Sequence, residues 1–200
     1  MSLMRSKFTS FLIVAVVGVS ALIGAAIAFG SNGNTPVASL SSGVAPGATE
    51  RENIDNLAGS VTRWNQESPD AGPGNALASK ATSLLTNVGR DKSDTLSAFP
   101  TGRGQVCFEI KAAGTCGSVD TPTGIIFAIL SIRGRSTVLY GVAADNVTRV
   151  QVQIGGQLTD ALLSGNGFYY QLPVDAAGGD VKQVLSTWAD GSVHTDPIHP

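Results

Sequence analysis

The stretch 148–163, TRVQVQIGGQLTDALL, is the clearest indication of the fold class of this chain. Apolar and polar residues alternate from Thr148 to Ile154, so one face of an extended strand collects the valines. Gly155 and Gly156 then fit a two-residue hairpin turn, where positive φ angles cost glycine little. Residues 157–163 return as the second strand. The stretch therefore predicts an antiparallel β-hairpin.

Similar strand patterns recur on both sides of this hairpin. Gln105 to Ile110 alternates strictly, and residues 125–132 form an apolar run typical of a strand covered on both faces. Asp190-Gly191 marks a further hairpin turn. The nine expected strands cover residues 95–99, 105–110, 125–132, 137–142, 148–154, 157–163, 168–172, 181–188 and 192–196. Their regular spacing favours an antiparallel β-sandwich or barrel over βαβ units, and so a mainly β (α+β) fold.

Two helices are expected before these strands. Ile54, Leu57, Val61 and Trp64 recur at helical spacing, and the segment from Thr49 to Glu52 fits a capping box. A second helix is expected from Asn75, with Gly89 as its C-terminal cap. Its apolar face would consist of Leu77, Ala81, Leu84, Leu85 and Val88. These patterns predict a helical segment over residues 50–93 and a β-domain over residues 94–200.

The first 29 residues form a segment for export. Arg5 and Lys7 precede an apolar run from Phe8 to Phe29 that carries no charge and is long enough to cross a bilayer as a helix. Two alternatives stay open: a signal peptide cleaved after Ala26-Ile27-Ala28, or an uncleaved transmembrane anchor. Residues 30–49 carry no charge before Glu50 and predict a flexible linker. Either alternative places the rest of the chain outside the cytoplasm.

Composition narrows the classes of function. The chain has 13 Lys and Arg against 15 Asp and Glu, a formal net charge of −2, which argues against a nucleic-acid partner. Two cysteines cannot form a four-cysteine zinc site, and two histidines offer little for a histidine-based active site. We find no phosphate-binding P-loop and no G-x-S-x-G motif. We therefore expect no cofactor.

The C-terminal half carries a resemblance. The stretches GVAADNVTRVQVQIGG (141–156), GNGFYYQLP (165–173) and TWADGSV (187–193) resemble immunoglobulin-like β-sandwich modules of exported bacterial proteins. The stretch AFPTGRGQVCFEI (98–110), with a second cysteine soon after, resembles uncharacterised actinobacterial exported or membrane-anchored proteins. The resemblance implies a fold and an exported location, and it assigns no catalytic or binding residue.

The two cysteines fit a structural disulfide. Cys107 and Cys116 flank the segment Lys111 to Gly114, which reads as a turn, so the two thiols can face each other across a hairpin. Export would place them in an oxidising compartment. The alternative, a redox pair, would prefer a C-x-x-C motif beside a helix N-terminus, and the sequence shows neither.

Three further groups are weaker candidates for a site. His194, Asp196 and His199 are metal-ligand types close together, with a solvated chain end as the alternative. An exposed ring at Tyr169, and the turn cations Arg133 and Arg135, are possible contacts for a glycan, an anionic wall polymer or a lipid headgroup. Carboxylates for hydrolysis would have to converge from loops. The carboxylates considered are Glu109, Asp120 and Asp145.

These observations favour a non-catalytic module of the cell envelope that acts outside the cytoplasm by binding a protein or polymer. The N-terminal helix, if uncleaved, would make the membrane a further partner. The alternative is a small extracytoplasmic hydrolase with carboxylates that meet only in the fold.

Overall fold

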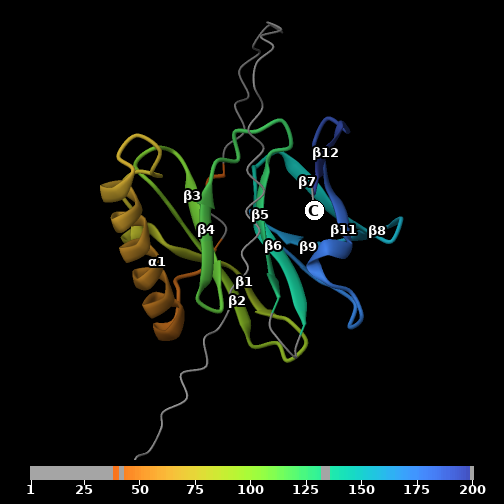
Figure 1. The fold of residues 1–200 in the computed structure, drawn as a ribbon, viewed down its shortest axis with the longest axis horizontal. Coiled ribbons are helices and arrows are strands. Elements are labelled where there is room, and N and C mark those ends of the chain that lie inside the picture. Colours follow the sequence, from red (N-terminus) through yellow and green to blue (C-terminus); the bar gives the residue numbers. More distant parts are fainter. Residues whose placement is uncertain (1–37, 41–42, 132–135, 199–200) are drawn as a thin grey trace, which may run out of the picture.

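A computed structural model describes residues 38–40, 43–131 and 136–198 of the chain. Within these residues it contains the helix α1, two short 3-10 turns and twelve strands in three antiparallel sheets (Figure 1). The mainly β class predicted from the sequence is confirmed. The export segment, residues 1–29, lies outside the described residues. Among the helices that are described, none is long and apolar enough to cross a membrane.

Helix α1, Ala48–Glu67, matches the first predicted helix. It begins after Gly47 without a side-chain cap, so the capping box expected at Thr49 is wrong. Its C-terminal cap is Ser68. Pro69 follows, and a proline disfavours the helical conformation in the residue before it. Ile54 and Val61 are buried, and this face of the helix packs against the first sheet.

The first sheet is a meander of four strands in sequence order. Its strands are β1 (Thr82–Val88), β2 (Asp94–Pro100), β3 (Val106–Ile110) and β4 (Ala113–Gly117). Because strand side chains alternate, Cys107 faces α1 while Val106 and Phe108 face the main core. The sheet lies between α1 and the other two sheets (Figure 1).

The second predicted helix is wrong. Residues 78–80 form one 3-10 turn, η1 (Ala78–Lys80), and residues 82–88 form strand β1. Pairing of β1 with β2 is interrupted by two register shifts, between Ser83 and Leu85 and between Leu85 and Val88. These irregularities break the period of two, so the buried apolar residues acquire a spacing that imitates a helix. The boundary expected near residue 93 therefore falls at the turn of the β1–β2 hairpin.

The second and third sheets complete the β-domain. The second has the order β5-β6-β10-β9, and the third has the order β12-β11-β7-β8. The strands of the second sheet are β5 (Ile125–Ser131), β6 (Thr137–Ala143), β9 (Leu162–Ser164) and β10 (Gly167–Gln171). The strands of the third sheet are β7 (Val147–Ile154), β8 (Gln157–Asp160), β11 (Val181–Trp188) and β12 (Val193–Pro197), and a second 3-10 turn, η2 (Gly178–Asp180), precedes β11.

The β-hairpin predicted for residues 148–163 is confirmed, with one difference. Gly155 and Gly156 take φ angles of +56° and +87° between β7 and β8, as a primed turn requires. The return strand divides in two, because β8 pairs with β7 in the third sheet while β9 pairs with β10 in the second. This crossing of the chain ties the two sheets together.

One continuous core joins the sheets. The ring of Phe108 in the first sheet meets that of Tyr140 in the second edge to face, with 5.8 Å between centroids. Gly167 of β10 lies against Leu84, so a Cβ there would come within 2.7 Å of it. Ser186 Oγ and Trp188 Nε1 of the third sheet both donate hydrogen bonds to the carbonyl of Thr123, which lies just before β5 of the second sheet.

The described part of the predicted linker packs on the domain. Leu40 is buried, and its backbone N–H donates to Asn166 Oδ1 at 3.2 Å. Val44 forms a β-bridge with Ser83 of β1. Residues 38–40 and 43–47 are therefore part of the domain surface, and the expectation of a flexible linker is wrong for them.

We predict opposite effects of alanine at two glycines. At Gly141 of β6 a Cβ would overlap the carbonyl oxygen of Ile126 and the ring of Phe168, so Gly141→Ala should lower the free energy of unfolding by about 1–3 kcal/mol. At Gly59 of α1 a Cβ meets nothing within 4 Å, so Gly59→Ala should raise it by about 0.5–1 kcal/mol. Urea denaturation of the two variants measures both, and a Gly141→Ala protein as stable as the wild type would contradict this packing.

Candidate functional site

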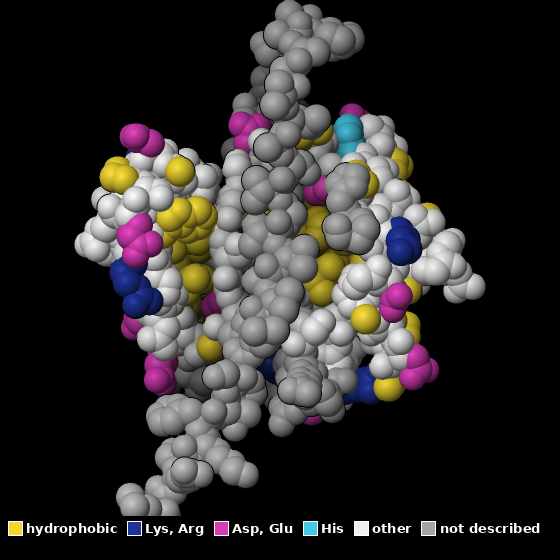
Figure 2. Space-filling view, viewed as in Figure 1, with side chains coloured by type: hydrophobic (Ala, Val, Ile, Leu, Met, Phe, Trp, Pro, Cys, Tyr) yellow, Lys and Arg dark blue, Asp and Glu magenta, His cyan; other side chains and the backbone are white. Residues whose placement is uncertain are grey.

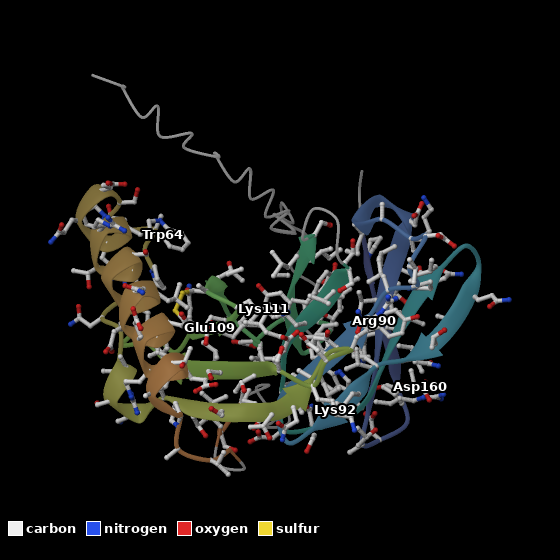
Figure 3. All side chains as sticks on the ribbon, turned by 90° about the horizontal axis from the view of Figure 1, so that it is seen from below. Trp64, Arg90, Lys92, Glu109, Lys111 and Asp160 are labelled. Atoms are coloured by element: carbon white, nitrogen blue, oxygen red, sulfur yellow. A yellow bond between two sulfur atoms is a disulfide. The ribbon has the colours of Figure 1, made fainter. Side chains whose placement is uncertain are left out.

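A groove separates α1 from the hairpin of β3 and β4. It encloses a cavity of about 200 Å³. Figure 2 shows hydrophobic side chains gathered between the α1 layer and the rest of the molecule, and Figure 3 shows Glu109 between the helix and the strands. We call this feature the α1 groove. Its lining residues are Asn53, Asn56, Leu57 and Ser60 of α1, with Glu109, Ala112 and Gly114 of the hairpin.

Helix periodicity places the polar lining beside the buried stripe. Asn53, Asn56 and Ser60 stand three and four residues apart, so they share one side of α1, next to the buried residues Ile54 and Val61. The helix packs chiefly on β2 and β3, where Phe99 and Cys107 are fully buried beneath it. Strand β4 is the sheet edge, and its residue Gly114 is exposed beside the helix. The groove is the gap between the helix and this edge.

Glu109 forms the acidic base of the groove. The alternation of β3 turns it toward α1, on the same face as Cys107, and the residue is only 1% exposed. Its Oε2 accepts a hydrogen bond from the backbone N–H of Ala112 at 3.2 Å. Its Oε1 is buried and has no hydrogen-bond partner among the described residues. A buried carboxylate oxygen without a donor is costly, so this atom marks an incomplete interaction.

The turn beside Glu109 is held by two acidic side chains. Lys111 and Ala112 both have positive φ angles, +52° and +60°, which are unfavourable for residues with a Cβ. The Lys111 ammonium forms a salt bridge with Asp94 at 2.8 Å, and Glu109 accepts from Ala112 N. The carboxyl group of Glu109 is thus positioned by a turn that it also stabilises.

The pKa of Glu109 is raised to about 7. Burial of the carboxyl group is the main cause, since it disfavours the charged form. The hydrogen bond from Ala112 acts in the opposite direction, and the charge of Glu50 on α1 adds to the increase. At neutral pH the group therefore exists in both protonation states.

Gly114 lets Leu57 of α1 and the side chain of Glu109 pack closely on strand β4. It pairs directly with Glu109 in the β3–β4 register. A Cβ at this position would lie 2.8 Å from Leu57 Cδ2 and 2.9 Å from the Cβ of Glu109. Any larger residue would therefore push against the helix and the acidic side chain.

The predicted disulfide is confirmed. Cys107 and Cys116 are directly opposite in the β3–β4 register and are joined, with 4.0 Å between their Cα atoms. Cys107 belongs to the small core beneath α1, together with Ile54 and Phe99. The bond indicates an oxidising, extracytoplasmic environment. It also fixes the hairpin that carries Glu109.

Two of the metal candidates, His194 and Asp196, lie on the edge strand β12, far along the chain from this groove. His194 stacks on Trp188 with 4.6 Å between ring centroids, and its Nε2 lies 3.1 Å from Ser192 Oγ. Ser192 Oγ donates its single proton to Asp190 Oδ1, so His194 Nε2 donates to Ser192 and does not act as its base. His199 lies outside the described residues. Among the described residues, no three or more His, Cys, Asp or Glu side chains are grouped so that they could hold a metal ion. Asp196 is therefore not part of such a group.

The remaining candidates do not converge. Tyr169 is 5% exposed, so the expectation of an exposed ring there is wrong. Asp145 accepts hydrogen bonds from Ser39 N and Asn166 Nδ2, and Asp120 is exposed on the loop after β4. Arg133 and Arg135 lie outside the described residues. Of the three carboxylates considered from sequence, Glu109 alone lines the groove.

The helical side of the groove was not predicted from the sequence. Asn53, Asn56 and Ser60 were not singled out, although polar residues at this spacing beside an apolar stripe indicate one partly covered face.

Comparison of the chain with protein-family models, curated proteins and solved structures found no match.

We predict that the disulfide stabilises the hairpin. Reduction should lower the free energy of unfolding by about 2–3 kcal/mol, because the bond closes a short loop of the unfolded chain. Denaturation with and without dithiothreitol measures this. The doubly substituted protein Cys107→Ala, Cys116→Ala is the control and should not respond to the reductant. An unchanged free energy of unfolding of the wild-type protein after complete reduction would contradict the prediction.

We also predict a pH dependence of stability that comes from Glu109. A carboxyl with a pKa of about 7 when folded and 4.5 when unfolded stabilises the fold fully below pH 4.5 and loses that contribution as pH rises through 7. The loss is at most about 3 kcal/mol, and less where water reaches the groove. Glu109→Gln keeps an acceptor for Ala112 N and removes the charge, so its stability should change less between pH 4.5 and 8. Equal pH profiles for the two proteins would count against the raised pKa.

Proposed function

We propose that this chain is a binding module of the cell envelope, acting outside the cytoplasm, and that it binds its ligand in the α1 groove. The observation that carries the proposal is that Glu109, whose buried Oε1 has no partner among the described residues, lines a partly open cavity. A ligand that donates a hydrogen bond there completes the interaction. The polar side chains Asn53 and Ser60 and the apolar Leu57 give the groove the mixed lining that small ligands require.

The exported location is supported from two directions. The disulfide requires an oxidising compartment, and the basic and apolar N-terminal sequence is typical of an export segment. We propose a domain that is secreted or held at the membrane by that segment. Its partner is an envelope protein or a wall polymer. The immunoglobulin-like resemblance of the C-terminal half stays a prediction.

We predict that filling the groove abolishes binding. Asn56 is exposed on α1 and lines the cavity, so Asn56→Trp should block the groove without disturbing the buried face of the helix. Gln66→Trp, exposed on the same helix outside the lining, is the control. Wild type and control should sediment with isolated wall polymer or crosslink to one envelope protein, and Asn56→Trp should lose at least tenfold in either assay. Equal retention of the two tryptophan variants would contradict the groove as the binding site.

A second candidate function has one specific observation in its favour. A pKa near 7 suits a general acid or base, so Glu109 can serve a small hydrolase. Hydrolysis of isolated envelope polymer by the wild type, lost in Glu109→Gln and kept in Glu52→Gln, would establish this function in place of pure binding.

A further inference from the structure

We propose that the α1 groove binds a primary alkylammonium group, such as the end of a lysine-type side chain, with the ammonium on Glu109 Oε1. This inference rests on the proposed function and names the chemical class of its ligand. Glu109 is 99% buried as a residue, and its Oε1 has no donor among the described residues. An ammonium supplies both the hydrogen bond and the opposite charge that this atom lacks.

The charges around the groove favour a cation. Glu50 on α1 is close enough to raise the pKa of Glu109, so the two acidic side chains create a negative potential at the cavity. Arg63 of α1 donates a hydrogen bond to the lining residue Ser60, and two other basic side chains are engaged away from the groove. Lys111 is paired with Asp94, and Arg51 donates to the carbonyl of Ala78. The described structure thus directs both of these cations away from Glu109.

The remaining lining suits the rest of such a ligand. An ammonium has three protons, and the side-chain oxygens of Asn53 and Asn56 are further acceptors along the same side of α1. Leu57 and Ala112 provide an apolar wall for the methylene chain. A cavity of about 200 Å³ accommodates one side-chain end and little more.

Binding should depend on pH in a stated direction. Alkylammonium groups stay protonated between pH 6 and 8, so a change in affinity over this range reports a protein group. Glu109, with a pKa of about 7, is charged above that pH and takes up a proton below it. The titratable groups that interact electrostatically with Glu109 are Glu50 from α1 and Tyr140 from β6, while Lys111 of the turn is paired with Asp94. Burial holds the pKa of Tyr140 above its ordinary range, so its hydroxyl stays neutral. Affinity should therefore rise with pH through 7.

The experiment is a titration of the full chain, purified in detergent, with n-butylammonium as the probe, followed by NMR. n-Butanol, tetramethylammonium and glucosamine are the comparison ligands. We expect n-butylammonium to bind at least tenfold more tightly than each of them, and more tightly at pH 8 than at pH 6. Nα-acetyl-lysine methylamide should match n-butylammonium if the natural ligand is a peptide side chain. Tighter binding of glucosamine would overturn the inference in favour of an amino sugar.

Three variants separate the inference from general effects on folding. Glu109→Gln should lose at least tenfold in affinity at pH 8 and all of the pH dependence. Glu50→Gln should lose a smaller factor in affinity, because Glu50 acts on the ligand only through its electrostatic field. Glu52 is an exposed acid on the same helix, so Glu52→Gln should bind as the wild type does. Circular dichroism confirms that each is folded. Undiminished binding by a folded Glu109→Gln protein, or no binding of the probe at millimolar concentration, would overturn the inference.

The two proposals fail in different ways. Envelope binding that is blocked by Asn56→Trp, in a protein that does not bind n-butylammonium, leaves the proposed function in place and rejects the ammonium. Probe binding at Glu109 without retention of any envelope polymer or protein rejects the proposed function and keeps the ligand class.

Discussion

The packing of α1 on the outer face of β2 and β3 is the contact on which the candidate site depends. Ile54 and Val61 press against Phe99 and Cys107, and all four are buried. Without the helix, this face of the sheet would be exposed to water and Glu109 would be an ordinary surface acid. With the helix in place, the same side chain is enclosed, and burial raises its pKa to about 7.

A second constraint keeps the enclosure incomplete. The helix lies over the middle of the first sheet, while β4 forms the edge and carries Gly114 opposite Glu109. The disulfide joins β4 to β3, and the Lys111–Asp94 salt bridge holds the turn between them. The hairpin is therefore rigid where it borders the groove. A rigid, partly desolvated carboxylate is suited to selecting a ligand by charge and hydrogen bonding.

Local patterns predicted much of this fold, and long-range contacts account for what they missed. Alternation identified β3 and β7, and turn residues indicated the disulfide. The sequence of strand β1 imitates a helix because its two register shifts interrupt the period of two. Glu109 was among the carboxylates considered from sequence, but its burial depends on α1 crossing β3, which no local pattern encodes. An exposed ring at Tyr169 is one possibility that the sequence leaves open, and the packing between sheets buries it.

The most direct test of this account is the titration of the Glu109 carboxyl group itself. Carbon-13 NMR of the glutamate-labelled chain, with the signal assigned by its loss in Glu109→Gln, follows the carboxyl carbon from pH 3 to pH 9. The account predicts a midpoint near 7, because the group is buried beneath α1 and its Oε1 has no donor among the residues that the structure describes. A midpoint near 4.5, the ordinary value, would show a solvated carboxylate and contradict the site.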